Sequence, residues 1–175
     1  MDLLLSKKHK AEYCLMGYTL IESLVVISII IIVAIMAFPY LGGWGSRLKL
    51  SNAARDIVSD LRLARQYAVS QNKQFKVIFD VDNEQYELKR GNKSFGSDAW
   101  TKVEYTRDYT EANSPYHSID IYSVTNDVVF NPDGSVSSTL VLELRNTKGE
   151  RCQVSIENLA TGFVKSYSWN GSSWE

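Results

Sequence analysis

Hydrophobic residues are concentrated near the N-terminus of this chain, in the run GYTLIESLVVISIIIIVAIMAFP at residues 17–39. From Tyr18 to Phe38 the only charged residue is Glu22. These 21 residues, as a helix rising about 1.5 Å per residue, would measure about 31 Å, close to the hydrocarbon thickness of a bilayer. The pattern predicts a membrane-spanning helix, which we assign to residues 18–41.

A proline and several glycines follow the apolar run. Pro39 removes a helical hydrogen bond, and Gly42 and Gly43, with Gly45 just beyond, weaken the helix. This composition favours a kink or local melting, so we expect a helix joint at these positions. An ordinary end of the helix is the alternative interpretation.

A second helical pattern occupies residues 46–71. Its apolar residues recur at intervals of three, four and seven, which places them on one face of a helix. The other faces carry arginines mixed with aspartates, as expected of a solvated surface. The apolar set is Leu50, Ala54, Ile57, Leu61, Ala64 and Ala68.

Beyond Asn72 the hydrophobic period changes from helical to alternating. QFKVIFD and QYELKR flank VDNE as a hairpin, and TKVEYT, SIDIYS, DVVFN, STLVLELRN, RCQVSIENL and FVKSYSW read as further short strands. Asn131 to Gly134 form a strong turn signal. The predicted fold class is α+β, with a long N-terminal helix packed against an antiparallel sheet or sandwich.

Positive charge precedes the apolar run. Lys7, Lys8, His9 and Lys10 stand directly before it, and the positive-inside rule places that side in the cytoplasm. No small-x-small cleavage site follows the run. We therefore expect residues 42–175 to form a soluble domain outside the cytoplasmic membrane, although Arg47 and Lys49 weaken the charge asymmetry.

The remaining composition argues against several functions. The formal net charge of −1 gives no sign of nucleic-acid binding. Two histidines leave little for a metal site or a catalytic triad. Cys14 and Cys152 would lie on opposite sides of the membrane, and Cys152 alternates with apolar strand residues, which indicates a buried thiol. We predict no enzyme activity, no cofactor and no metal.

One polar cluster has two interpretations. Asp80, Asp82, Asn83 and Glu84 carry oxygen ligands suited to calcium, but their spacing departs from a calcium-loop pattern. The favoured interpretation is a polar turn.

The sequence from Gly17 to Pro39 resembles the class III signal of type IV pilins and type II secretion pseudopilins. The shared features are a basic leader, the glycine Gly17, a methylatable residue at Tyr18 and a glutamate at Glu22. The resemblance implies that prepilin peptidase removes residues 1–17 as a leader peptide and methylates Tyr18. It also implies that Glu22 pairs with the terminal amine of a neighbouring subunit, whereas a first-turn residue that favours the helix dipole is the simpler alternative.

Further resemblance narrows the family. VVFNPDGSVS, LVLELRN and CQVSIENLATGFV, following a helix and a hairpin, are similar to the minor pseudopilin H (GspH) and FimT branch. Members of that branch that bind DNA carry a G-R-x-R motif, whereas Gly162, Phe163, Val164 and Lys165 lack both arginines here. DNA binding is therefore not expected.

The resemblance implies a structural function. We expect a single-pass protein of the bacterial inner membrane. An inner-membrane assembly platform would join it to other pilins or pseudopilins in a type II secretion pseudopilus. The alternative is a FimT-like or FimU-like minor pilin of a type IV pilus, including a binding module at the pilus tip that takes part in DNA uptake. Tyr167, Trp169 and Trp174 could serve such a module, although strand residues at a domain edge are the favoured interpretation.

Overall fold

A computed structural model describes residues 19–111 and 114–175 of the chain; at positions 37–44 and 104–106 it describes the backbone course alone. By its internal contacts the chain divides into two units, Met1–Leu41 and Gly42–Glu175. The hydrophobic core formed by the described residues lies entirely in the second unit. The predicted leader, residues 1–17, and Tyr18 lie outside the described residues.

One long helix, α1 (Leu20–Gln71), opens the described chain. Its C-terminal part has the predicted apolar face: Leu50, Ile57 and Leu61 are almost fully buried. The helix ends where predicted because Asn72 adopts a positive φ of 50°, a left-handed conformation that commonly terminates helices.

Within the described part of the chain, eight strands follow this helix, and their positions agree with the expected alternating segments. They are β1 (Phe75–Asp80), β2 (Gln85–Gly91), β3 (Trp100–Asp108), β4 (Ile119–Val124), β5 (Val128–Phe130), β6 (Leu140–Asn146), β7 (Arg151–Ile156) and β8 (Val164–Ser168). β1 and β2 form the predicted hairpin, with Asp80 opposite Gln85. The α+β fold class is confirmed.

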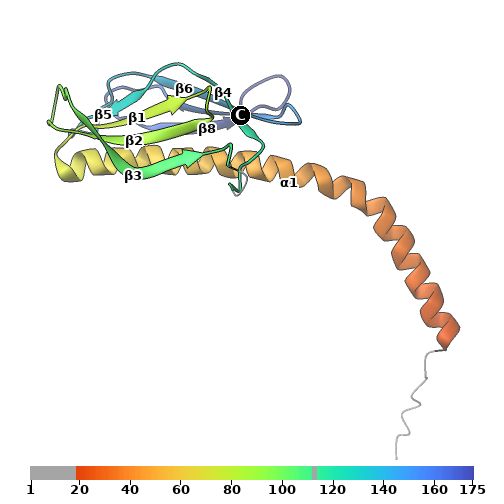
Figure 1. Ribbon diagram of the computed structural model, residues 1–175. Helices are drawn as coiled ribbons and strands as arrows, with labels where there is room; N and C mark the ends of the chain where they lie inside the picture. The colour runs from red at the N-terminus through yellow and green to blue at the C-terminus, as the bar shows by residue number, and fades with distance from the viewer. Residues whose placement is uncertain (1–18, 112–113) are drawn as a thin grey trace, which may run out of the picture. The chain divides into compact units, whose positions relative to one another are not determined.

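The strands form two antiparallel sheets, each of four strands. The first has the order β3-β2-β1-β5 and the second the order β4-β6-β7-β8. Figure 1 shows strands running beside the yellow part of α1 in the second unit. The helix and both sheets contribute to a single core, with Ile57 from α1, Phe130 from β5 and Leu142 from β6 all buried in it.

The predicted joint lies within α1. The helix spans Pro39, Gly42 and Gly43, so it does not end there. Proline within a helix interior favours a bend because it removes one backbone hydrogen bond. The role of these residues as a flexible joint stays a prediction.

Candidate assembly site

The first turn of α1 is closed by a side-chain cap. Thr19 Oγ1 accepts a hydrogen bond from the Glu22 backbone N–H at 3.3 Å, and the Thr19 carbonyl accepts from Ser23 N–H at 3.2 Å. Threonine at the cap with glutamate three residues later is a capping-box pattern. Glu22 was predicted from the sequence to lie in the first turn, whereas Thr19 was not identified, although the T-x-x-E spacing indicates it.

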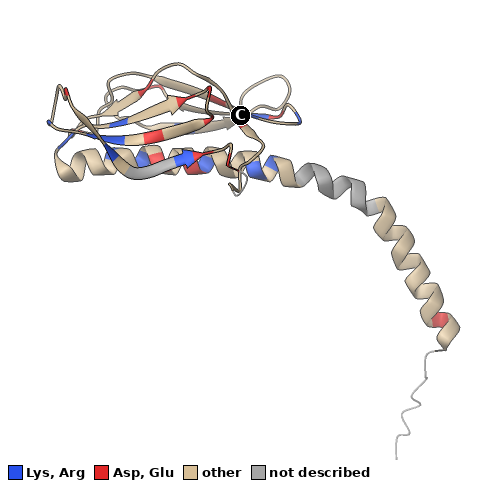
Figure 2. Cartoon of the chain, viewed as in Figure 1, with Lys and Arg blue, Asp and Glu red and all other residues tan. Residues whose placement is uncertain are grey.

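Residues 20–36 of α1 expose large apolar side chains on all sides. Their exposed fractions range from 48% at Val26 to 84% at Leu20. Glu22 is the only charged residue among them, and Figure 2 shows a red acidic segment near this end of α1. A helix that is apolar around its whole circumference is normally covered by lipid or by other protein.

Among residues 19–111 and 114–175, the structure contains no helical stretch that combines the length and the apolar character needed to cross a bilayer.

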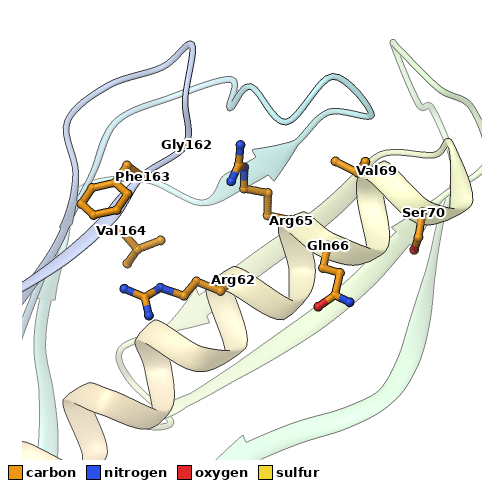
Figure 3. A pocket seen from close by; sticks show the side chains of 8 residues that line it. All are labelled: Arg62, Arg65, Gln66, Val69, Ser70, Gly162, Phe163 and Val164. Atoms are coloured by element: carbon orange, nitrogen blue, oxygen red, sulfur yellow. The ribbon is translucent and has the colours of Figure 1, made fainter.

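A groove lies between α1 and the loop before β8, with a volume of about 560 Å³. Figure 3 shows Arg62 and Arg65 extending from α1 toward Gly162, Phe163 and Val164. The Phe163 side chain is 56% exposed, and no carboxylate is among the lining residues that the structure describes. The loop that lacks the two arginines of the G-R-x-R motif therefore lies beside two arginines of the helix.

Backbone contacts hold this groove in shape. Arg65 Nε donates to the Gly134 carbonyl at 3.0 Å. Gly162 has a positive φ of 56°, and a Cβ built on it would lie 2.9 Å from the Gly134 carbonyl oxygen. Because real Cβ atoms do not approach an oxygen this closely, the close approach of the two loops requires glycine at position 162.

A half-buried polar cluster joins β3 to α1. Arg107 Nη1 donates to Asp56 Oδ2 at 3.0 Å, and the Tyr116 hydroxyl donates to the same oxygen at 2.6 Å. Asp60 accepts from Arg107 and from the Tyr86 hydroxyl. Both carboxylates therefore accept hydrogen bonds from a guanidinium group and from a tyrosine hydroxyl. These hydrogen bonds connect α1 to β3 and to other parts of the domain.

Tyrosine pKa values in this region are raised by burial. Removal from water, followed by the hydrogen bond to Asp56, raises the pKa of Tyr116 to about 12. Burial also raises the pKa of Tyr109. Both phenols therefore stay protonated at neutral pH and act as donors or packing groups rather than as bases.

The polar residues after β1 form a turn. Asp80 Oδ1 accepts from the Asn83 N–H at 3.1 Å and Asp80 Oδ2 from Asn83 Nδ2 at 2.7 Å. These hydrogen bonds lower the pKa of Asp80. Within the described residues, no group of three or more side chains is placed to hold a metal ion.

The C-terminal aromatic residues pack against one another and against polar groups. The rings of Trp169 and Trp174 are 5.2 Å apart in an edge-on arrangement, and the Tyr167 hydroxyl donates to Glu157 Oε1 at 3.3 Å. Cys152 is buried as predicted, and burial raises the pKa of its thiol. We therefore expect the thiol of Cys152 to be unreactive.

A long N-terminal helix with an exposed apolar first half, followed by an α+β domain built on its second half, defines a pilin-like protein. The sequence profile of the family described as "Type II transport protein GspH" matches residues 53–160. The chain belongs to the GspH family, which confirms the predicted branch.

Two solved structures share this fold. The minor pseudopilin EpsH from the type 2 secretion system of Vibrio cholerae has a TM-score of 0.52 and 13% identity, over 69% of this chain and 97% of that one. GspH of Escherichia coli has a TM-score of 0.52 and 14% identity, over 71% and 92%.

The type IV minor pilin FimU of Pseudomonas aeruginosa has a TM-score of 0.49 and 16% identity, over 75% of this chain and 96% of that one. No curated protein sequence matches the chain.

Proposed function

We propose that this protein is a minor pseudopilin, a structural subunit of a type II secretion pseudopilus, with no catalytic activity of its own. The observation that carries the proposal is the exposed apolar segment at residues 20–36, with the single carboxylate Glu22 in its first turn. Such a segment needs a covering environment. A bilayer supplies it before assembly, and the helices of other subunits supply it afterwards.

The proposed route begins with insertion as a single-pass protein of the bacterial inner membrane, with the basic leader on the cytoplasmic side and the C-terminal domain in the periplasm. Prepilin peptidase cuts between Gly17 and Tyr18 and methylates Tyr18. The inner-membrane assembly platform then adds the subunit to other pseudopilins.

Glu22 acts at this step by pairing with the terminal amine of a neighbour. Opposite charges attract strongly where the dielectric constant is low, although desolvation offsets part of the gain. The pairing would set the stagger between neighbouring helices.

Glu22 and Thr19 together form a capping-box pattern, so a test of charge pairing by Glu22 must be separated from an effect on helix capping. Glu22→Gln removes the charge and keeps a side chain that suits the box, whereas Thr19→Val removes the cap hydroxyl and keeps the charge. Both variants are expressed with the remaining secretion components, and their share in sheared filaments is measured. We expect Glu22→Gln to be processed normally but absent from filaments, with Thr19→Val still incorporated. Equal incorporation of Glu22→Gln and the unmodified protein would contradict the pairing.

A second function, a tip binding module of a type IV pilus, is favoured by the groove of Figure 3. Two guanidinium groups beside the exposed ring of Phe163 suit a ligand with anionic and flat apolar parts, such as single-stranded DNA. A gel-shift titration across salt concentrations tests it, with Arg62→Gln compared with the exposed Arg55→Gln. No shift at low salt would eliminate DNA as the ligand.

A further inference from the structure

β8 lies at one edge of the second sheet, beside β7. The Trp169 N–H donates to the Arg151 carbonyl at 3.0 Å, and hydrogen-bonded positions alternate along an antiparallel pair of strands. Ser168 and Ser166 are among the other positions of β8, so they direct their backbone N–H and C=O groups away from β7. These groups form the free edge of the sheet.

The C-terminal residues already pair with part of this edge. The Ser168 N–H donates to the Glu175 carbonyl at 2.7 Å, and the Glu175 N–H donates to the Ser168 carbonyl at 3.0 Å. The backbone of Ser166 has no such partner among the described residues, and Ser166 is exposed although Val154, opposite it on β7, is fully buried. A strand edge with unpaired donors and acceptors is a template for another extended segment.

The groove of Figure 3 begins two residues before Ser166 on β8. Val164 lines it, beside Arg62, Val69 and Phe163, whose side chains are exposed. Two residues of extended strand span about 7 Å. A segment paired with Ser166 would therefore place one of its own side chains over the groove.

The groove has a definite chemistry. Val69 and the ring of Phe163 supply apolar contacts. Arg65 is held by the Gly134 carbonyl, whereas Arg62 has no ion pair with any described residue. Because no carboxylate is among the described lining residues, the groove complements a segment that carries an apolar side chain and a carboxylate on the same face.

We propose that the free edge of β8 at Ser166, together with this groove, binds an extended segment of a partner protein as an added strand, with a carboxylate of that segment against Arg62. All of these residues belong to the second unit, so this surface requires neither the membrane anchor nor the pseudopilus function. Single-stranded DNA fits the guanidinium group and the ring, but it lacks the alternating donors and acceptors with which a strand edge pairs.

A capped synthetic peptide tests the proposal, with threonines on one face and valine, aspartate and valine on the other. It is titrated into the isotope-labelled full chain in detergent micelles, and hydrogen exchange of single amides is followed by NMR. We expect the Ser166 N–H to exchange quickly in the free chain and to become protected by the peptide. The Lys165 N–H, at a position that pairs with β7, should be protected throughout. A peptide with lysine in place of aspartate should bind more weakly.

Two substitutions at one position isolate the contribution of the edge. Ser166→Pro removes the N–H at the free edge and no hydrogen bond to β7, and proline is tolerated at such edge positions. Ser166→Ala keeps the N–H. We expect Ser166→Pro to lose the peptide and Ser166→Ala to retain it, with urea midpoints showing that both variants are folded. Equal binding by the two variants would overturn the proposal.

A second pair of variants tests the groove without changing β8. Arg62→Gln and Lys49→Gln each remove one exposed cation from α1, and of the two only Arg62 lines the groove. We expect Arg62→Gln to weaken peptide binding about tenfold, the contribution of a hydrogen bond to a charged group, and Lys49→Gln to leave it unchanged. Equal effects of these variants, or peptide binding that leaves the Ser166 amide unprotected, would overturn the proposal.

Two further outcomes would assign the surface to another occupant and overturn the partner segment. Protection of the Ser166 amide that appears without peptide and grows with protein concentration would assign the edge to a second copy of this chain. Oligothymidine binding that depends on Arg62, with no binding of the peptide, would assign the groove to single-stranded DNA.

Discussion

Arg107 on β3 reaches Asp60 on α1, with its Nε 3.0 Å from Asp60 Oδ2. The Asp60 side chain is only 12% exposed, and its partner is 31% exposed. The same guanidinium binds Asp56 one turn earlier on the helix. The contact therefore fixes one edge of the first sheet to the helix that carries the assembly segment.

Replacement of Arg107 by glutamine leaves two carboxylates without their cation: Asp60, which is 12% exposed, and Asp56, which is 35% exposed. We expect a loss of about 2 kcal/mol in the free energy of unfolding, below the range for fully buried pairs because both partners retain some solvent. Urea unfolding of the full chain in detergent micelles measures this. Lys102→Gln is the control: Lys102 is 54% exposed and pairs with Glu87 at 2.8 Å, so its loss should cost about 0.5 kcal/mol or less.

Gly162→Ala tests the close approach of two loops beside the groove. Alanine here combines a positive φ of 56° with a Cβ only 2.9 Å from a backbone oxygen. Gly149 supplies the matched control because its φ is 77° and a Cβ there meets nothing within 4 Å. We expect Gly149→Ala to cost about 1 kcal/mol for the backbone alone, and Gly162→Ala to cost clearly more. Equal losses in unfolding experiments would show that the loops separate freely.

The free energy of unfolding should fall at alkaline pH because of the polar cluster that contains Tyr116. The folded-state pKa of Tyr116 is raised from 10.0 to about 12, so the protonated phenol stabilises the fold. This contribution is complete below pH 10 and is lost as the pH rises from 10 toward 12. Tyr109 contributes in the same direction because burial raises its pKa as well.

Tyr116→Phe should flatten that pH dependence. Urea midpoints measured between pH 9 and pH 12 should decline less steeply in the variant than in the unmodified chain. Tyr122→Phe, at a 52% exposed position, should keep the unmodified slope. A Tyr116→Phe slope as steep as that of the unmodified chain would contradict the assigned role of this phenol.

The elements of the fold were predictable because each has a local hydrophobic period. The end of α1 at Gln71 and the β1–β2 hairpin both follow from residues close together in sequence. A sandwich of two sheets was among the predicted arrangements, but the sequence did not predict which strands form each sheet. β5 joins β1, with Phe130 opposite Phe75, whereas β4 joins β6 in the other sheet, and such choices depend on packing between distant segments.

The functional residues also divide into those that the local sequence identifies and those that come together only in the folded domain. Glu22 was identified from a local motif, and Thr19 could have been. The groove was missed because Arg62 and Phe163 meet only in the folded domain, and the partnership of Asp60 with Arg107 was missed for the same reason. Gly17 and Tyr18 lie outside the described residues, so the processing site stays a prediction.

The most direct test of the pseudopilin assignment is the intact mass of the protein recovered from membranes of cells that contain prepilin peptidase. The chain should begin at Tyr18 and carry one added methyl group, and substitution of Gly17 should leave the precursor uncut. A protein that still begins at Met1 in the presence of an active peptidase would contradict the account.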